Sequence, residues 1–202
     1  MLYIVRHGKT AYNIERRLQG QRDIPLCYEG LLQAEELGQK LKREGRVFGA
    51  LYSSRLQRAR VTAEIIGRHM GLEPIGVSGL EEICLGIFEG HTFAEAAELF
   101  PFEYAAYSAD MARCASHGGE TPRQVLLRAR AALLSLPEVQ KLLAGEETKD
   151  ILVVSHGAVT AYLRAAAKGI DLVGYPELIP GNAELIPFGI EELERIAAYE
   201  LE

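Results

Sequence analysis

Two segments of this 202-residue chain end an apolar run with a histidine and a glycine. In Leu2–Gly8, four apolar residues are followed by Arg6 and His7, and in Ile151–Gly157 a similar run leads through a serine to His156. Each pattern is typical of a buried parallel strand that runs into a loop. Ligands of open α/β sheets bind at the carboxyl ends of such strands. We therefore expect two histidines and an arginine at one edge of the sheet, in a site for an anion and for chemistry on it.

The residue types at the first strand end favour phosphoryl chemistry. An unprotonated imidazole is a nitrogen nucleophile, and neighbouring cations favour that protonation state. The guanidinium of Arg6 carries a fork of donors that matches phosphate oxygens. His7 is therefore the candidate nucleophile, and Arg6 is a candidate phosphate ligand.

Two further segments place charged side chains where an anion site would use them. Ser53–Ala63 is predicted to be a strand end followed by a helix start, with Arg58 in the first helical turn. The helix dipole disfavours a cation there, so Arg58 is better explained with an anion to bind. Leu80–Gly90 mixes carboxylates with apolar residues and glycines, which predicts a folded loop. A carboxyl in such a loop, beside a dianion, would be favoured in its protonated form and suits a general acid.

The rest of the chain alternates strand and helix patterns. This alternation predicts an α/β fold in which helices cover both faces of a mostly parallel sheet, as a three-layer α/β/α sandwich spanning residues 1–202 as one domain. Residues 9–28 are expected to form a loop, and residues 91–120 are the candidate lid. The expected strands cover residues 2–6, 50–53, 74–77 and 151–154, and the expected helices cover 29–44, 56–70, 92–100, 122–143 with a break at Pro137, and 158–168.

The last twenty residues allow two interpretations. Strands are expected near residues 183–188 and 195–201, and the alternative for Glu191–Ala198 is a helix. The pattern alone does not choose between them.

Composition limits the partners of the protein. The formal net charge of −6 and the absence of a Lys/Arg tract argue against nucleic acid. No run reaches transmembrane length, and only four apolar residues stand between Met1 and Arg6, which argues against a signal peptide. The three cysteines, Cys27, Cys84 and Cys114, lack metal-ligand spacing and are expected to be reduced thiols. We therefore expect a cytoplasmic protein, monomeric or homodimeric, that binds no membrane.

Four segments together resemble the signature of the histidine phosphatase superfamily, the phosphoglycerate mutase-like family. Arg6-His7-Gly8 with Asn13 resembles its first motif. Ser53–Ala63, Leu80–Gly90 and Ser155–Gly157 resemble the second, third and fourth, in the family's order. Gln19-Gly20 is similar to the loop that follows the first motif.

The resemblance implies a role for each matching residue. His7 would attack phosphorus and become a phosphohistidine, while Arg6, Arg58 and His156 hold the phosphoryl oxygens. Glu82 would protonate the leaving alkoxide and then activate water. No metal and no cofactor is expected, because arginine and histidine supply the positive charge. The remaining members of the implied phosphate-binding set are Asn13, Gln19, Gly20 and Gly157.

Phosphatases and mutases share these motifs. Cofactor-dependent mutases carry a longer insertion with a basic Arg-Arg-Ser-Tyr-type stretch, whereas Ala105–Ser116 contains one arginine, Arg113. Gly118-Gly119-Glu120-Thr121 is similar to an element of the phosphatase branch. We therefore predict a phosphomonoesterase acting on a small phosphorylated metabolite, similar to α-ribazole phosphatases or broad-specificity phosphatases. The alternatives are a cofactor-dependent phosphoglycerate mutase and a non-catalytic phosphate or phosphoprotein binder.

Two basic residues depart from the family pattern. Lys9 stands where an acidic residue is common, and Arg55 stands where proline or aspartate is common. Both are expected to be solvated charges at the rim of the site, and the alternative is that either points inward and selects more anionic substrates. His69, His91 and His117 fit no motif and are interpreted as bystanders.

Overall fold

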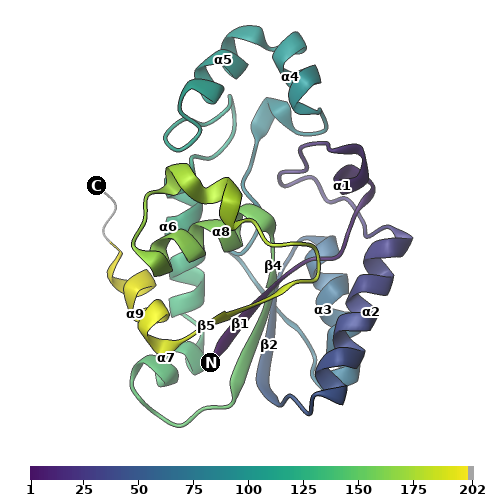
Figure 1. Ribbon diagram of the computed structural model, residues 1–202, viewed down its shortest axis with the longest axis vertical. Helices are drawn as coiled ribbons and strands as arrows, with labels where there is room; N and C mark the ends of the chain where they lie inside the picture. The colour runs from purple at the N-terminus through teal and green to yellow at the C-terminus, as the bar shows by residue number, and fades with distance from the viewer. Residues whose placement is uncertain (200–202) are drawn as a thin grey trace.

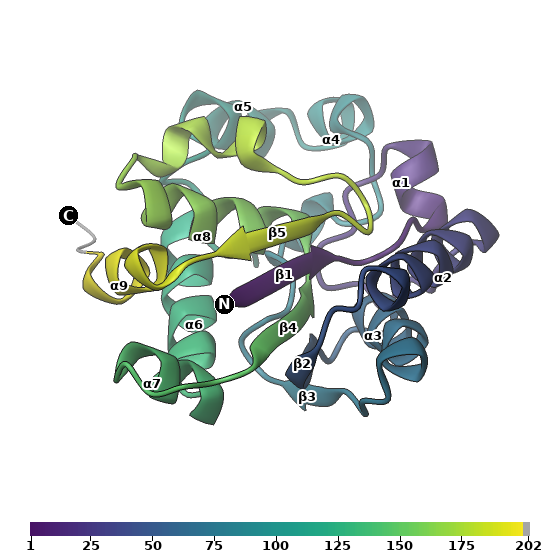
Figure 2. The same ribbon diagram turned by 60° about the horizontal axis from the view of Figure 1, so that its bottom comes forward.

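A five-stranded sheet lies at the centre of the molecule. The computed structural model describes residues 1–199. The strands of the sheet are β1 (Leu2–Arg6), β2 (Phe48–Ser54), β3 (Ile75–Val77), β4 (Asp150–Ser155) and β5 (Leu185–Phe188). They lie in the order β3-β2-β4-β1-β5 (Figures 1 and 2). Neighbours are parallel except β5, which runs antiparallel to β1. The predicted α/β fold with a mostly parallel sheet is confirmed.

The two strands that end in His-Gly are neighbours. β1 pairs with β4 in parallel, so that Leu2 lies opposite Ile151 and Arg6 opposite Ser155. Both strands are apolar along almost their whole length because both of their faces are buried. The histidines that follow them consequently leave the sheet at the same edge, as the sequence predicts.

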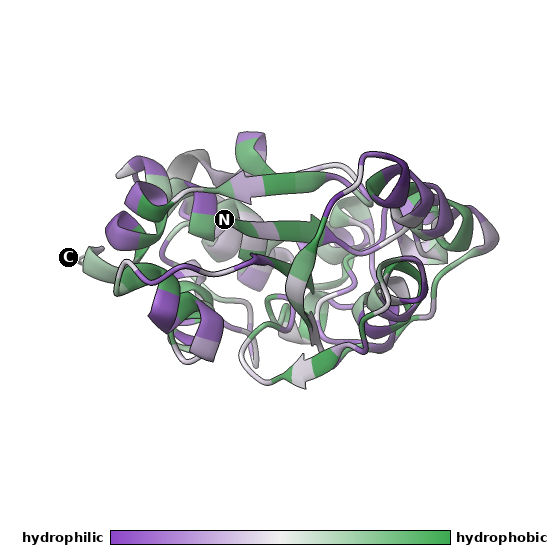
Figure 3. Ribbon diagram, turned by 90° about the horizontal axis from the view of Figure 1, so that it is seen from below, coloured by the Kyte–Doolittle hydropathy of each residue, from purple (hydrophilic) through white to green (hydrophobic). Residues whose placement is uncertain are grey.

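Helices cover both faces of the sheet and divide the core in two. Alternate side chains of β1 point to opposite faces. Leu2 and Ile4 join one apolar cluster, whereas Tyr3 and Val5 join the other. Figure 3 shows hydrophobic strands in the middle and hydrophilic surfaces on the flanking helices. One face carries α2 (Tyr28–Arg43) and α3 (Gln57–Met70), and the other carries α6 (Pro122–Leu134), α7 (Pro137–Leu143), α8 (Gly157–Lys168) and α9 (Ile190–Ala198).

Three short helices lie beyond the carboxyl ends of the strands, at the top of Figure 1. They are α1 (Ala11–Glu15), α4 (Phe93–Leu99) and α5 (Pro101–Ala109). The expectation of a loop over residues 9–28 is wrong for residues 11–15, because Thr10 and Asn13 form a capping box that begins α1. Pro101 ends α4 as expected and also begins α5, since proline is favoured at the first helical position. Two 3₁₀ helices, η1 (Gly86–Phe88) and η2 (Leu172–Leu178), complete the connections.

Residues 190–198 form the helix α9, in a region where the sequence allows either a strand or a helix. A strand near 195–201 is wrong for residues 195–199, and the alternative helix is correct, because Leu193 and Ile196 lie three residues apart on the buried side of α9. Residues 200 and 201 of that expected strand lie outside the described part. The strand expected near 183–188 is confirmed as β5. Pro187 is tolerated within it because β5 is an edge strand.

Candidate active site

His7 follows β1 directly, and its ring is buried. Its Nδ1 lies 2.7 Å from the carbonyl oxygen of Gly8. A carbonyl accepts hydrogen bonds, so this contact places the imidazole proton on Nδ1 and leaves the lone pair on Nε2. Burial lowers the pKa of His7 well below its ordinary value, and the Arg58 and Arg6 guanidiniums lower it further. His7 therefore presents the unprotonated nitrogen that a nucleophile needs.

His156 lies beside His7 at the end of β4. The two ring centroids are 5.2 Å apart, and His156 is fully buried. Its Nε2 lies 2.8 Å from Oγ of Ser54, a hydroxyl that also accepts from the backbone of Leu56. If this hydroxyl donates to Nε2, the ring proton resides on Nδ1, where it is free to donate to an anion. Burial lowers the pKa of His156 well below its ordinary value, with Arg58 as the next cause.

The two arginines are anchored to backbone carbonyls. Arg58 is fully buried although it lies in the first turn of α3, and its Nη1 and Nη2 donate to the carbonyls of Arg22 and Gly20 at 2.7 Å each. Nη1 of Arg6 donates to the carbonyl of Pro180, also at 2.7 Å. Burial lowers the pKa of both guanidiniums, and the Glu82 carboxylate acts in the opposite direction. Each arginine is thus held in place with part of its donor set unused.

Unpaired buried nitrogens converge at this edge of the sheet. In the described part of the chain, six buried side-chain nitrogen or oxygen atoms have no hydrogen-bond partner. Three of the six are Nε of Arg6, Nε of Arg58 and Nδ1 of His156. Buried polar groups are almost always hydrogen-bonded. A cluster of such nitrogens on two guanidiniums and an imidazole therefore indicates an anion-binding site.

Glu82 reaches the same site from the loop that follows β3. Its Oε2 accepts from the backbone nitrogen of Ala158 at 3.3 Å, near the start of α8, and its Oε1 accepts from its neighbour Ile83 at 3.0 Å. The Ser155 hydroxyl donates to the carbonyl of Leu80 at 2.9 Å and ties this loop to β4. The carboxylate is thus placed next to the second His-Gly segment.

The predicted accessory residues are two polar side chains, Asn13 and Gln19, and two glycines, Gly20 and Gly157. Asn13 and Gln19 are linked through Thr10, whose backbone nitrogen donates to Asn13 Oδ1 at 3.0 Å and whose hydroxyl donates to Gln19 Oε1 at 2.9 Å. Gly20 has a φ of +52°, and its carbonyl receives Arg58, so its backbone conformation serves the arginine. A Cβ at Gly157 would lie 3.3 Å from Cζ of Arg6, so only a glycine lets that guanidinium pack there without displacement.

Several contacts of the site escape sequence reasoning. Nδ2 of Asn182 donates to the backbone carbonyl of His7 at 2.9 Å, from a loop that carries no recognised motif. Arg128 and Gln21 donate to the carbonyl of Glu82. Lys9 forms a 2.5 Å ion pair with Glu29 on α2, as a partly exposed rim charge.

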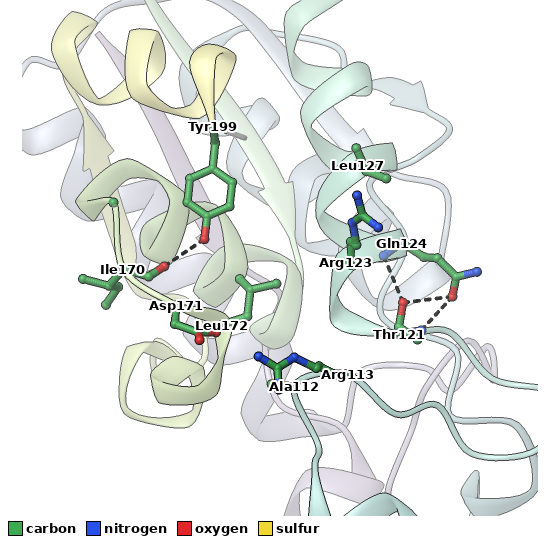
Figure 4. A pocket seen from close by; sticks show the side chains of 11 residues that line it. Ala112, Arg113, Thr121, Arg123, Gln124, Leu127, Ile170, Asp171, Leu172 and Tyr199 are labelled. Atoms are coloured by element: carbon green, nitrogen blue, oxygen red, sulfur yellow. Dashed lines mark hydrogen bonds between the residues drawn. The ribbon is translucent and has the colours of Figure 1, made fainter. Parts of the chain in front are cut away.

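A pocket lies away from these residues (Figure 4). This pocket of about 820 Å³ lies between the start of α6 and the segment that links α8 to η2, with Tyr199 on its wall. The hydroxyl of Tyr199 donates to the carbonyl of Ile170 there. None of the nine predicted site residues lines the pocket. Its place in the fold therefore does not link it to the candidate chemistry.

Membrane spans and metal-binding clusters are both absent from residues 1–199. No helix in this range combines the length and apolar character of a membrane span. No three His, Cys, Asp or Glu side chains in this range are grouped so that they could hold a metal ion.

Comparisons with known proteins place the chain in a family. Residues 2–197 match the model of the histidine phosphatase superfamily (branch 1), and the chain belongs to this family. It is 32% identical over 179 residues to glucosyl-3-phosphoglycerate phosphatase of Mycobacterium tuberculosis, which covers 88% of this chain and 79% of the relative. It is also 32% identical over 201 residues to a probable phosphoglycerate mutase, GpmB, of Salmonella paratyphi C, covering 98% and 88%.

Solved structures give the same family of folds. A mycobacterial glucosyl-3-phosphoglycerate phosphatase in complex with VO3 superposes with a TM-score of 0.75 at 33% identity, covering 91% of this chain and 90% of that one. A putative alpha-ribazole-5'-P phosphatase of Escherichia coli has a TM-score of 0.79 at 24% identity, covering 91% and 87%, and shows the fold alone. The phosphatase relatives support a hydrolase that acts on phosphate esters.

The buried histidines predict a pH-dependent stability. The folded-state pKa values of His7 and His156 lie below the ordinary value, which the unfolded chain retains. Below about pH 6.5 the unfolded state therefore binds more protons, and the free energy of unfolding falls by up to about 1.4 kcal/mol per pH unit for each histidine. Urea titrations at pH 7 and pH 5.5 should show this loss, and His156→Asn should show a smaller one. An equal pH dependence in the variant would contradict the assignment.

Proposed function

We propose that this protein is a metal-independent phosphomonoesterase that hydrolyses a small phosphorylated metabolite through a phosphohistidine at His7. The observation that carries the proposal is the set of three unpartnered buried nitrogens on Arg6, Arg58 and His156. They adjoin an imidazole whose proton is held on Nδ1 by Gly8. Such a site binds a phosphoryl group and offers it a nucleophile.

The proposed reaction has two steps. Nε2 of His7 attacks phosphorus, the ester P–O bond breaks, and the leaving alkoxide takes a proton from Glu82. Water then attacks the phosphohistidine, Glu82 accepts a proton from it, and the P–N bond breaks to release phosphate and free imidazole. The fixed donors of Arg6, Arg58 and His156 stabilise the charge that develops on the equatorial oxygens.

We propose further that residues 91–120 form a lid that selects the leaving group. They include α4 and α5, which lie beyond the carboxyl ends of the strands (Figure 1). The start of this segment is fastened by Arg17, which donates to the carbonyl of Gly90 at 3.0 Å and pairs with Glu95. Tyr107 of α5 is buried against Phe88 of η1, with ring centroids 5.4 Å apart.

The first test is hydrolysis of p-nitrophenyl phosphate in the presence of EDTA. We expect turnover that chelation does not reduce. A mutase assay with 3-phosphoglycerate and its bisphosphorylated cofactor is run in parallel, because the GpmB relatives favour that alternative. Cofactor-dependent isomerisation without hydrolysis would replace the phosphatase proposal by the mutase. Loss of hydrolysis with EDTA would contradict the metal-independent mechanism.

Glu82→Gln tests the general acid. The amide keeps the shape of the carboxyl but has no acidic proton to donate. A nitrophenolate leaves without protonation, whereas an alkoxide needs it, so we expect a loss of about 10²-fold or more in kcat/KM for an alkyl phosphate and a much smaller loss for p-nitrophenyl phosphate. Equal losses for the two esters would show that Glu82 is not the acid.

A further inference from the structure

Arg128 of α6 is bonded to the loop that carries Glu82. We call residues 79–85 the acid loop. Nη1 of Arg128 donates to the carbonyls of Gly79 at 2.9 Å and Glu81 at 2.6 Å, and Nη2 donates to the carbonyl of Glu82 at 2.9 Å. A guanidinium has five donor hydrogens in a fixed plane. Three of the five donor hydrogens of Arg128 bond to carbonyls of the acid loop, and one of these carbonyls belongs to Glu82 itself.

Glu120 holds the other side of the same guanidinium. Its Oε1 and Oε2 accept from Nε and Nη2 of Arg128, both at 2.8 Å. Oε2 also accepts from the backbone nitrogen of Cys84 at 2.9 Å, and the backbone nitrogen of Glu120 donates to the Cys84 carbonyl at 2.8 Å. Both members of the ion pair have side chains that are 22% exposed. The Arg128–Glu120 ion pair thus holds the acid loop by hydrogen bonds near both of its ends, at Gly79 and at Cys84.

The hydrogen bonds of Arg128 and Glu120 to the acid loop bear on the position of the Glu82 carboxyl. The carboxyl oxygens are held by two backbone amides, those of Ile83 and Ala158. The Glu82 carbonyl is held by Arg128 and, at 3.1 Å, by Nε2 of Gln21. A shift of the acid loop would therefore move the carboxyl away from α8 and from the leaving group, while His7, which follows β1, would stay in place.

We propose that Arg128 and Glu120 are positioning residues that hold Glu82 where it can protonate the leaving group. This inference rests on the proposed function of Glu82 as the general acid. The proposal also assigns a role to the Gly118–Thr121 element, which contains Glu120. Its glutamate fixes the acid loop, and the Ile87 nitrogen, which donates to the His117 carbonyl at 3.1 Å, joins the same loop region to the end of the lid segment.

The test compares two esters on the same preparation of each variant, with glycerol 3-phosphate as the alkyl ester and p-nitrophenyl phosphate as the aryl ester. The ratio of the two kcat/KM values cancels any unfolded fraction. Arg128→Lys and Glu120→Gln should each lower the alkyl rate about 10-fold or more and the aryl rate less than about threefold. Arg130→Lys is the matched control, because Arg130 on α6 donates to the carbonyls of Ala197 and Tyr199 instead. Its ratio should equal that of the wild type.

A double variant separates positioning from general destabilisation. If Arg128 acts through Glu82, Arg128→Lys should have almost no further effect on the alkyl rate once Glu82→Gln is present. Equal alkyl and aryl losses in Arg128→Lys, or fully additive losses in the double variant, would overturn this inference alone. Equal alkyl and aryl losses in Glu82→Gln would overturn the acid role in the proposed function, and this inference with it.

Discussion

Replacing His7 with alanine is expected to lower kcat for every phosphate monoester by at least about 10⁴-fold, because the variant lacks the atom that attacks phosphorus. The fold should persist. The side chain is bonded to the adjacent Gly8 carbonyl, whereas the backbone is held independently by Ser155, at 3.0 Å, and by Asn182. Steady-state kinetics and circular dichroism on the same sample measure both expectations.

A matched histidine serves as the control for this variant. His69 lies on α3, where its Nε2 is 2.8 Å from Glu35 of α2, away from the sheet edge that holds His7. His69→Asn should retain the wild-type rate. A His7→Ala enzyme that keeps more than about a tenth of the wild-type rate would show that another group, or water alone, attacks phosphorus.

Arg58→Met is the second variant with a large expected effect. Methionine has a similar length but no charge and no hydrogen-bond donor. The phosphoryl group therefore loses one donor, and the carbonyls of Gly20 and Arg22 lose the hydrogen bonds that Arg58 donates to them. Removing one preorganised donor commonly costs about 10²–10³-fold, and we expect a loss in kcat/KM at the upper end of this range. The Arg58 cation also lowers the pKa of His7. The variant should therefore raise that pKa and move the acid limb of the kcat/KM profile to higher pH.

Arg60→Met controls for the loss of an arginine from the same helix. Arg60 is half-exposed and pairs with Glu64 one turn further along α3. We expect an unchanged pH profile and an activity within about twofold of the wild type, because exposed pairs contribute little. An acid limb that stays in place in Arg58→Met would contradict the proposed electrostatic contact between Arg58 and His7.

The site residues whose positions could be predicted from the sequence are those that follow a strand of the sheet. The apolar runs before His7 and His156 demand burial on both faces, and this puts the two strands inside one sheet. Their pairing in register, with Arg6 opposite Ser155, follows from parallel neighbours. The positions of Arg58 and of the Leu80–Gly90 loop follow from the same topology, because each comes after a strand of this sheet.

The remaining features depend on contacts between distant segments. Arg128 lies on a helix whose pattern of residues is ordinary, and its importance comes from carbonyls some 46 to 49 positions earlier in the chain. The helix α1 depends on a short capping box between Thr10 and Asn13, within a segment rich in charge and turn residues. The Glu191–Ala198 segment allows a helix or a strand from its sequence, and the burial of Leu193 and Ile196 in the core decides for the helix.

The central claim is the phosphohistidine at His7, and trapping it is the most direct measurement. The Glu82→Gln enzyme is mixed with p-nitrophenyl phosphate, which needs no acid to leave, and quenched in alkaline denaturant. Intact-mass spectrometry should show the addition of one phosphoryl group, and fragmentation should place it on His7. The same treatment of the His7→Ala, Glu82→Gln double variant should show no adduct. A phosphoryl group on any other residue, or hydrolysis that proceeds without an adduct, would contradict the account.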